Sequence, residues 1–248
     1  MTPMWSTLTW VRPMLLEVKD LEVAYGDFQV VWGVSLNIDE GEVVTLLGPN
    51  GSGKSTVINT VSALVPVLRG DILVDGTSIS SKPTHHRARL GIAHVLERRR
   101  VFPYLTVEQN LTLGAWHEDA KMAREETLDH VCGMFPILRN RSGQLAHTLS
   151  GGEQQMLALA RGLMAKPRLL MVDEPFLGLA PQVIDQMKQA FEDIRSTGIA
   201  ILFIEQNVRL ALSMADRGYV LESGRLAVSG KAKSLMNHKI VRRVFLGA

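Results

Sequence analysis

Apolar and polar positions alternate in short runs along the first hundred residues, a spacing typical of β strands. The apolar runs between residues 15 and 47 are interrupted at 25–27 and 39–41 by segments containing glycine and aspartate, which predicts strands joined by tight turns. The other elements expected here are a strand with a turn within 68–76, a helix over 84–90 and a strand over 92–96. The N-terminal part is therefore expected to be rich in strands.

From about residue 104 to residue 165 the apolar positions change to helical spacing. Thr106, with Gln109 three residues later, fits the start of a helix, because each side chain can bond the backbone N–H of the other residue. Residues 120–139 are predicted to be largely helical, and residues 153–165 are predicted to form another helix. This part is expected to be a mostly helical insertion.

Beyond residue 168, predicted strands and helices alternate, which is typical of an α/β fold with a parallel sheet. The expected elements are strands over 169–172 and 200–204, helices over 182–196 and 208–215, and a hairpin formed by 219–221 and 226–228.

Residues 1–13 contain two tryptophans and two prolines and have no clear period. We expect a loose tail here, with Met14 as the natural start of the protein; an added strand is the alternative. The segment lacks the basic start and long apolar core of a secretory signal. No apolar run approaches the roughly 20 residues needed to span a bilayer.

The composition is that of an ordinary globular protein, with 46% hydrophobic and 21% charged residues among 248. That length suits one large domain or two small ones. A net charge of +2 gives no electrostatic case for nucleic-acid binding. The single cysteine, Cys132, excludes an internal disulfide, and its apolar neighbours favour a buried, inert thiol.

A glycine-rich segment connects an apolar run at 43–47, predicted as a buried strand, to a predicted helix at 57–61. The segment consists of Gly48, Pro49, Asn50, Gly51, Ser52, Gly53, Lys54, Ser55 and Thr56. It fits the P-loop pattern, in which backbone N–H groups and a helix N-terminus surround phosphate oxygens. Lys54 is expected to reach the β- and γ-phosphates, and the Ser55 hydroxyl to bind Mg²⁺. The alternative, a chance match in a glycine-rich turn, is disfavoured by the strand before it. The chain therefore has a predicted α/β nucleotide-binding core.

The predicted strand at 169–172 is followed by two carboxylates, Asp173 and Glu174. In P-loop enzymes an aspartate at such a strand end binds Mg²⁺, often through water, and a neighbouring glutamate can orient or deprotonate the attacking water. Two acidic residues that merely end a strand are the alternative, and the motif alone would be a weak signal.

Leu149 precedes Ser150, Gly151, Gly152 and Glu153 at the start of the helix predicted near 153–165. A serine and two glycines before a helix can bind an anion, although they also fit an ordinary helix cap. A chain with one P-loop has no obvious use for a second phosphate site. A dimer would, because one subunit's motif could cover the nucleotide held by the other.

Together these motifs resemble the ATP-binding subunit of ABC transporters, over residues 14–248. The resemblance implies an α/β fold: a P-loop NTPase core of a mixed sheet flanked by helices, an N-terminal antiparallel β subdomain, and a helical subdomain over about 104–165. It also implies that Tyr25 stacks on adenine, that Asp173 and Ser55 bind the metal, that Glu174 is catalytic, and that Ser150 to Glu153 contact the partner's ATP.

The resemblance is finer to the paired ATPases of branched-chain amino-acid importers. It is carried by residues 99–103 with 105–108, by 149–157, by 177–181 and by 205–207, and the ending 241–247 is also similar. Urea importer ATPases are similar as well. The basic run 98–100 could meet a permease loop or form a solvated face.

Two positions depart from most ABC ATPases. Glu97 replaces a glutamine that touches Mg²⁺, and Gln206 replaces a histidine that contacts the γ-phosphate. A carboxylate at position 97 can still bind Mg²⁺ but adds negative charge. Glutamine at 206 can donate a hydrogen bond but cannot carry a positive charge. We therefore expect a site with catalytic residues Glu174, Gln206 and Glu97 and with reduced, partner-dependent turnover.

The resemblance implies an ATP- and Mg²⁺-dependent ATPase attached to the cytoplasmic face of the inner membrane. Its expected partners are a second ABC ATPase, in a heterodimer or a homodimer, the transmembrane permease subunits, and indirectly an external solute-binding protein. One alternative is a soluble ABC ATPase of DNA repair or translation, which the absence of long heptad stretches disfavours. Another is a regulatory subunit that binds ATP without turnover, which Glu174 disfavours.

Overall fold

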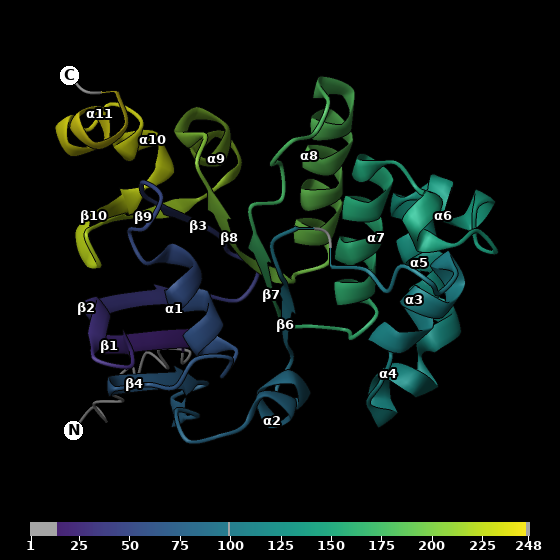
Figure 1. Ribbon diagram of the computed structural model, residues 1–248, viewed down its shortest axis with the longest axis horizontal. Coiled ribbons are helices and arrows are strands. Elements are labelled where there is room, and N and C mark those ends of the chain that lie inside the picture. The colour runs from purple at the N-terminus through teal and green to yellow at the C-terminus, as the bar shows by residue number, and fades with distance from the viewer. Residues whose placement is uncertain (1–13, 99, 247–248) are drawn as a thin grey trace, which may run out of the picture.

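The strands form two sheets in the computed structural model, which describes residues 14–98 and 100–246 (Figure 1). The first sheet is antiparallel, in the order β2-β1-β4-β5, and the second is mixed, in the order β10-β9-β3-β8-β7-β6. The strands of the antiparallel sheet are β1 (Leu16–Tyr25), β2 (Phe28–Ile38), β4 (Arg69–Val74) and β5 (Thr77–Ser78). Those of the mixed sheet are β3 (Val43–Leu47), β6 (Ile92–Val95), β7 (Leu169–Asp173), β8 (Ala200–Glu205), β9 (Arg217–Glu222) and β10 (Arg225–Lys231).

Helices surround the mixed sheet, and several gather beyond its β6–β7 side (Figure 1). They are α1 (Lys54–Val61), α2 (Thr84–Arg89), α3 (Val107–Gly114), α4 (Glu118–Met122), α5 (Arg124–Met134), α6 (Pro136–Asn140), α7 (Gly151–Leu163), α8 (Pro181–Ser196), α9 (Val208–Met214), α10 (Ala232–Leu235) and α11 (Lys239–Leu246). None of these described helices combines the length and apolar character that a membrane crossing requires. The predicted fold class is confirmed: a mixed sheet flanked by helices, with an antiparallel sheet from the N-terminal part.

The central strand β3 is buried on both faces, because its side chains point alternately into two separate cores. Val44 and Leu46 belong to the core shared with the antiparallel sheet and α1. Val43 and Leu47 belong to the core shared with the helices on the other face. Burial on both faces explains why four of the five residues here are apolar, Thr45 being the exception. It also makes the C-terminal end of β3 a rigid support for the loop that follows.

The segment 120–139 is largely helical, as expected, and the chain divides it into α4, α5 and α6. Ala123 separates the first two helices, with ψ near 13°. Phe135 leaves the helical region, with φ −126° and ψ 73°, immediately before Pro136. A proline disfavours helical geometry in the residue before it, and Pro136 then occupies the first turn of a new helix.

The C-terminal part contains longer strands and more helices than expected. The predicted hairpin is longer, formed by β9 and β10 in full, and the helices α10 and α11 follow it. Helix α11 could have been predicted, because Ile240, Val241, Val244 and Phe245 are apolar at helical spacing. The tail expected over residues 1–13 lies outside the described residues.

Candidate active site

Three parallel strands of the mixed sheet end at one place, and each is followed by residues that can do chemistry. Strand β3 leads into residues 48–53 and then α1, β7 ends at Asp173, and β8 ends at Glu205. The register brings these ends together, since Leu47 pairs with Glu205 and Asp173 pairs with Ile204. Ligands of α/β sheets bind at this edge, outside the carboxyl ends of the strands.

The loop between β3 and α1 has the curled backbone that the glycine pattern predicts. Gly51 and Gly53 have φ values of 78° and 97°, a left-handed conformation that residues with a side chain rarely adopt. At Gly48 a Cβ atom would lie 2.3 Å from the Ser52 hydroxyl oxygen. Glycine is thus required both for the curvature and for the close packing of the loop on itself.

The turn between β9 and β10 supports the loop from the side. The Gly224 N–H donates to the Ser52 carbonyl at 3.1 Å, and the Trp32 N–H donates to the Gly224 carbonyl at 2.8 Å. No side chain fits at Gly224, because its Cβ would lie 2.0 Å from the Val30 carbonyl oxygen. Strand β2, the P-loop and the β9–β10 turn are therefore connected by hydrogen bonds.

A pocket of about 510 Å³ opens above these strand ends. It brings predicted residues from four parts of the chain together: the P-loop, Glu97, Glu174 and Gln206. Its lining consists of Val30, Asn50, Gly51, Gly53, Lys54, Ser55, Thr56, Glu97, Glu174, Leu177 and Gln206. Tyr25 lies at its border, where its hydroxyl is 3.4 Å from the Thr56 hydroxyl oxygen and 48% of the residue is exposed.

The Lys54 ammonium group is buried and folded back on the loop. It donates to the carbonyl oxygens of Gly48 at 2.8 Å and Pro49 at 2.9 Å. Burial lowers the pKa of Lys54, while the negative charges of Glu174 and Asp173 act to raise it. The ammonium group is thus held by neutral carbonyls and lies close enough to the Glu174 and Asp173 carboxylates to interact with their charges.

Asp173 is 3% exposed, and burial raises the pKa of its carboxyl to about 6, with the charges of Glu174 and Glu97 contributing. A hydrogen bond from Ser55 acts in the opposite direction. The Oδ1 atom of Asp173 has no hydrogen-bond partner among the described residues. A buried carboxylate oxygen without a partner, beside a hydroxyl, suits a hard divalent cation such as Mg²⁺.

The protein alone supplies few ligands for such a cation. No three His, Cys, Asp or Glu side chains within the described part of the chain are grouped to hold a metal ion. Mg²⁺ commonly binds through one or two carboxylates together with substrate phosphates and water. Ser55, Asp173 and Glu97 therefore fit a metal that arrives with a phosphate ligand.

Glu174 and Gln206 are 32 residues apart in sequence but touch each other. The Gln206 side-chain amide donates to Glu174 Oε1 at 2.5 Å. Glu174 has the unusual φ of 50°, and its N–H donates to the Ile204 carbonyl of the neighbouring strand at 3.1 Å. The backbone strain and the two hydrogen bonds fix the Glu174 carboxylate at the pocket wall.

The predicted second anion motif lies at the start of α7, outside this pocket and across the fold from α1 (Figure 1). Ser150 caps α7: its hydroxyl accepts from the Glu153 N–H at 3.4 Å, and the Glu153 carboxylate accepts from the Ser150 N–H at 2.8 Å. Arg141 pairs with Glu153 at 3.2 Å. Gly152 packs on Val183, and Ser150 and Gly151 begin the helix with the serine exposed.

Comparison with known proteins identifies the arrangement. The family model described as ABC transporter matches residues 31–177, which is more than half of the chain. The chain belongs to the ABC transporter family. As a member it binds ATP and hydrolyses it.

The relatives of this ABC ATPase include proteins of different transport systems. It is 42% identical over 233 residues to the high-affinity branched-chain amino acid transport ATP-binding protein BraG of Pseudomonas aeruginosa, covering 94% of this chain and 100% of that protein. It is 36% identical to the lipopolysaccharide export system ATP-binding protein LptB of Haemophilus influenzae, covering 94% and 97%. A nucleotide-free ATP-binding cassette from an ABC transporter superimposes with a TM-score of 0.84, at 23% identity, over 95% of this chain and 100% of that one.

One acidic residue of this ABC ATPase was missed by the sequence reasoning. Glu205 is 6% exposed at the end of β8, and its charge acts on Lys54. Burial raises the pKa of the Glu205 carboxyl. The signal was present, because Glu205 ends an apolar strand in the same way as Asp173.

Proposed function

We propose that this ATPase powers the import of branched-chain amino acids through a separate membrane permease. The observation that carries the proposal is the 42% identity to BraG over the full length of that protein. The identity to LptB over a similar length is 36%.

ATP is expected to place its phosphates on the curled P-loop and its adenine on the half-exposed ring of Tyr25. The Lys54 ammonium would exchange its carbonyl partners for phosphate oxygens, which offer a stronger, charge-assisted bond. Ser55 and Asp173 would hold Mg²⁺, with Glu97 beside them. The bound metal would neutralise phosphate charge, which matters because the site has several carboxylates around one lysine.

Glu174 is the proposed base or orienting group for the water that attacks the γ-phosphate, because it is the carboxylate fixed at the pocket wall. Gln206 holds Glu174 through its amide and can turn a donor toward the phosphate. It cannot supply the positive charge that histidine would bring. We therefore expect hydrolysis that is slower than with histidine at this position.

A dimer completes the proposed site. Ser150 to Glu153 do not line the pocket of their own chain, yet Ser150 is exposed at a helix N-terminus suited to an anion. In a dimer this motif would contact the ATP bound by the partner. ATP would then join the subunits, and hydrolysis would release them. A second ABC ATPase and a second copy of this chain both remain candidates for the partner.

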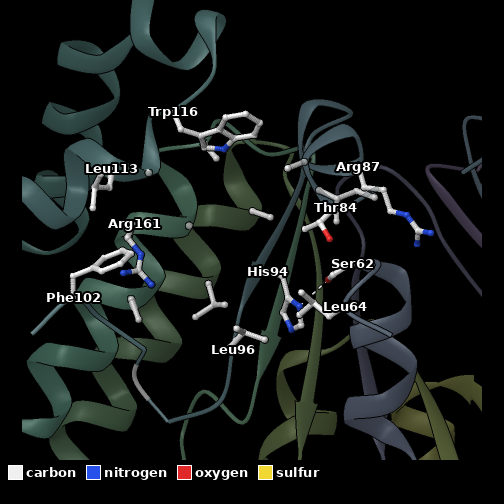
Figure 2. Close-up of a pocket in the computed structure, with 18 residues that line it drawn as sticks. Ser62, Leu64, Thr84, Arg87, His94, Leu96, Phe102, Leu113, Trp116 and Arg161 are labelled. Atoms are coloured by element: carbon white, nitrogen blue, oxygen red, sulfur yellow. Dashed lines mark hydrogen bonds between the residues drawn. The ribbon is translucent and has the colours of Figure 1, made fainter. Parts of the chain in front are cut away.

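A second pocket, of about 470 Å³, is the proposed contact with the permease (Figure 2). Phe102, Leu113 and Arg161 lie on one side of it, and Ser62 and Leu64 lie on the other. Phe102 is half exposed, with the Arg161 guanidinium 5.1 Å from its ring centre. Exposed apolar side chains around a hollow suit a short, largely apolar cytoplasmic segment of a partner.

The permease pocket and the nucleotide pocket share a strand. Strand β6 and Leu96 line the first, and the next residue, Glu97, lines the second. A segment that pushes on β6 would thereby move a carboxylate beside the proposed metal. Attachment to the cytoplasmic face of the membrane would then occur through the permease.

Purification of the tagged chain from detergent-solubilised native membranes, followed by mass spectrometry, tests this function. Two multi-span permeases and a second P-loop ATPase are expected, with ATP-dependent uptake of leucine lost when the gene is deleted. Uptake of urea or another solute instead would refute the substrate. Recovery of only soluble nucleic-acid or ribosomal proteins would refute the transport function.

Lipopolysaccharide export is the second candidate, favoured by the 36% identity to LptB across 94% of this chain. The purification and the uptake assay together separate the two candidates. If the chain serves an export system, deletion of its gene leaves amino-acid uptake unchanged.

A further inference from the structure

The Glu205 carboxylate holds the backbone at the point where β8 passes into α9. Its Oε1 atom accepts two hydrogen bonds, from the N–H of Gln206 at 3.1 Å and from the N–H of Asn207 at 3.2 Å. Its Oε2 atom is buried, with no hydrogen-bond partner in the described part of the chain. One oxygen thus fixes two successive peptide groups, and the backbone of Phe176 adds a weaker stabilising contact to the carboxylate.

The same turn is fixed from its other side by the cap of α9. The Asn207 side chain accepts from the Leu210 N–H at 3.1 Å. Gln206 therefore lies between a residue whose carboxylate holds its N–H and a residue that starts a helix. The Gln206 backbone therefore has little freedom, and the direction of its Cα–Cβ bond is fixed.

That side chain reaches Glu174 at 2.5 Å, and Glu174 is itself bonded through its N–H to the Ile204 carbonyl. Both ends of the contact between Gln206 and Glu174 are thus anchored on the last residues of β8. We propose that Glu205 is a positioning residue for ATP hydrolysis, whose carboxylate fixes the Gln206 backbone so that the Gln206 amide holds Glu174. This inference rests on the proposed roles of Glu174 and Gln206.

The burial of Glu205 argues for such a role over a purely structural one. A carboxylate that is 6% exposed and close to the charge of Glu174 is unfavourable for folding, and burial raises its pKa. Local features that reduce stability are expected where geometry serves a reaction. An apolar side chain would fill the same space without that penalty, but it could not accept the two N–H groups.

The test compares two substitutions of similar volume in the full-length chain. Glu205→Gln keeps an oxygen that can accept both N–H groups, and Glu205→Leu removes it. Thr45→Val is the matched control, because Thr45 is fully buried on the adjacent β3 and its hydroxyl has no partner among the described residues. Thermal unfolding confirms that each variant is folded. Amide hydrogen exchange at residues 206 and 207 measures the two hydrogen bonds to Glu205 independently of activity.

We expect Glu205→Leu to lower the kcat of ATP hydrolysis by about ten- to a hundredfold, the effect of a misplaced catalytic group, with little change in KM. Glu205→Gln should remain within about threefold of the wild type, and only Glu205→Leu should speed exchange at residues 206 and 207. In a Gln206→Ala background, Glu205→Leu should cause no further loss, because its effect acts through Gln206.

Multiplicative losses in the double variant, a Glu205→Gln variant as slow as Glu205→Leu, or unchanged amide exchange in Glu205→Leu would each overturn the inference. Glu174→Gln and Gln206→Ala variants that hydrolyse ATP as fast as the wild type would instead refute the proposed roles of these residues, and the exchange measurement would still decide whether Glu205 anchors Gln206.

Discussion

Replacing Asp173 by asparagine is expected to stabilise the protein without nucleotide while removing its response to Mg²⁺ and ATP. Burial raises the pKa of Asp173 from 3.8 to about 6 in the folded chain. Between these two values the folded state holds a proton that the unfolded state has lost. The free energy of unfolding therefore falls as pH rises from about 4 to about 6, and it stays lower above that range.

The magnitude follows from the size of the shift. Two pKa units at 1.36 kcal/mol per unit correspond to about 3 kcal/mol at pH 7.5. Asparagine has nearly the same shape and cannot ionise, so the substitution should recover up to about 3 kcal/mol at pH 7.5 and almost none of it at pH 4. A gain of this size is a large fraction of a typical domain's stability.

Urea unfolding at several pH values between 4 and 7.5, without nucleotide or metal, measures this difference. Addition of Mg²⁺ and ATP should raise the unfolding midpoint of the wild type, because ligand binding stabilises the folded state, and leave the Asp173→Asn variant nearly unchanged. Asp75→Asn is the control of opposite sign, because the hydrogen bond from Arg168 lowers the pKa of Asp75 and its replacement should cost stability at pH 7.5.

A variant whose advantage is the same at pH 4 and pH 7.5 would refute the reasoning, because the gain would then not come from ionisation. An advantage that shrinks as pH rises would refute it as well. A variant that is stabilised by Mg²⁺ and ATP as strongly as the wild type would remove Asp173 from the proposed metal site.

Four further substitutions test other parts of the site. Lys54→Ala should weaken ATP binding by at least about tenfold, measured by fluorescence with a labelled nucleotide, and unchanged affinity would exclude phosphate binding by Lys54. Glu174→Gln should keep that affinity but lose about 10²- to 10⁴-fold in single-turnover hydrolysis, and unaltered hydrolysis would remove Glu174 from its role. Gln206→His should raise steady-state turnover by about tenfold through a charge-assisted bond, and an unchanged rate would count against the expected effect of glutamine. Gly224→Ala should lower the free energy of unfolding by about 1–3 kcal/mol, because of its φ of 76° and its close approach to the Val30 carbonyl, whereas the control Gly230→Ala on β10 has open space; equal effects in urea unfolding would contradict this.

Much of the site could be predicted because its chemistry is contiguous in sequence. The P-loop carries its own strand, glycines, lysine and serine within a few residues, so local pattern was sufficient. Asp173 followed from its place at the end of an apolar strand. Glu205 occupies an equivalent place, yet a carboxylate after a strand gains meaning only when the neighbouring strands are known.

The predicted helical segment 120–139 is interrupted before Pro136 for a local reason. Its composition favours a helix throughout, but Pro136 restricts Phe135 and the chain bends there. Tertiary packing then takes Phe135 into the core, where it is 2% exposed. Propensity summed over a segment cannot place such a break, because one residue decides it.

The sequence by itself determined the α/β class, the phosphate-binding loop and the two carboxylates at the end of β7, since each depends on residues close together in the chain. Only the tertiary structure decided that β3 lies between β8 and β9, that Gln206 touches Glu174, and that α7 begins far from the P-loop of its own chain. The physical reason is that strand pairing and burial are non-local. They set which strand ends meet, and the desolvation that shifts the pKa of Asp173 exists only after the sheet and its two cores have assembled.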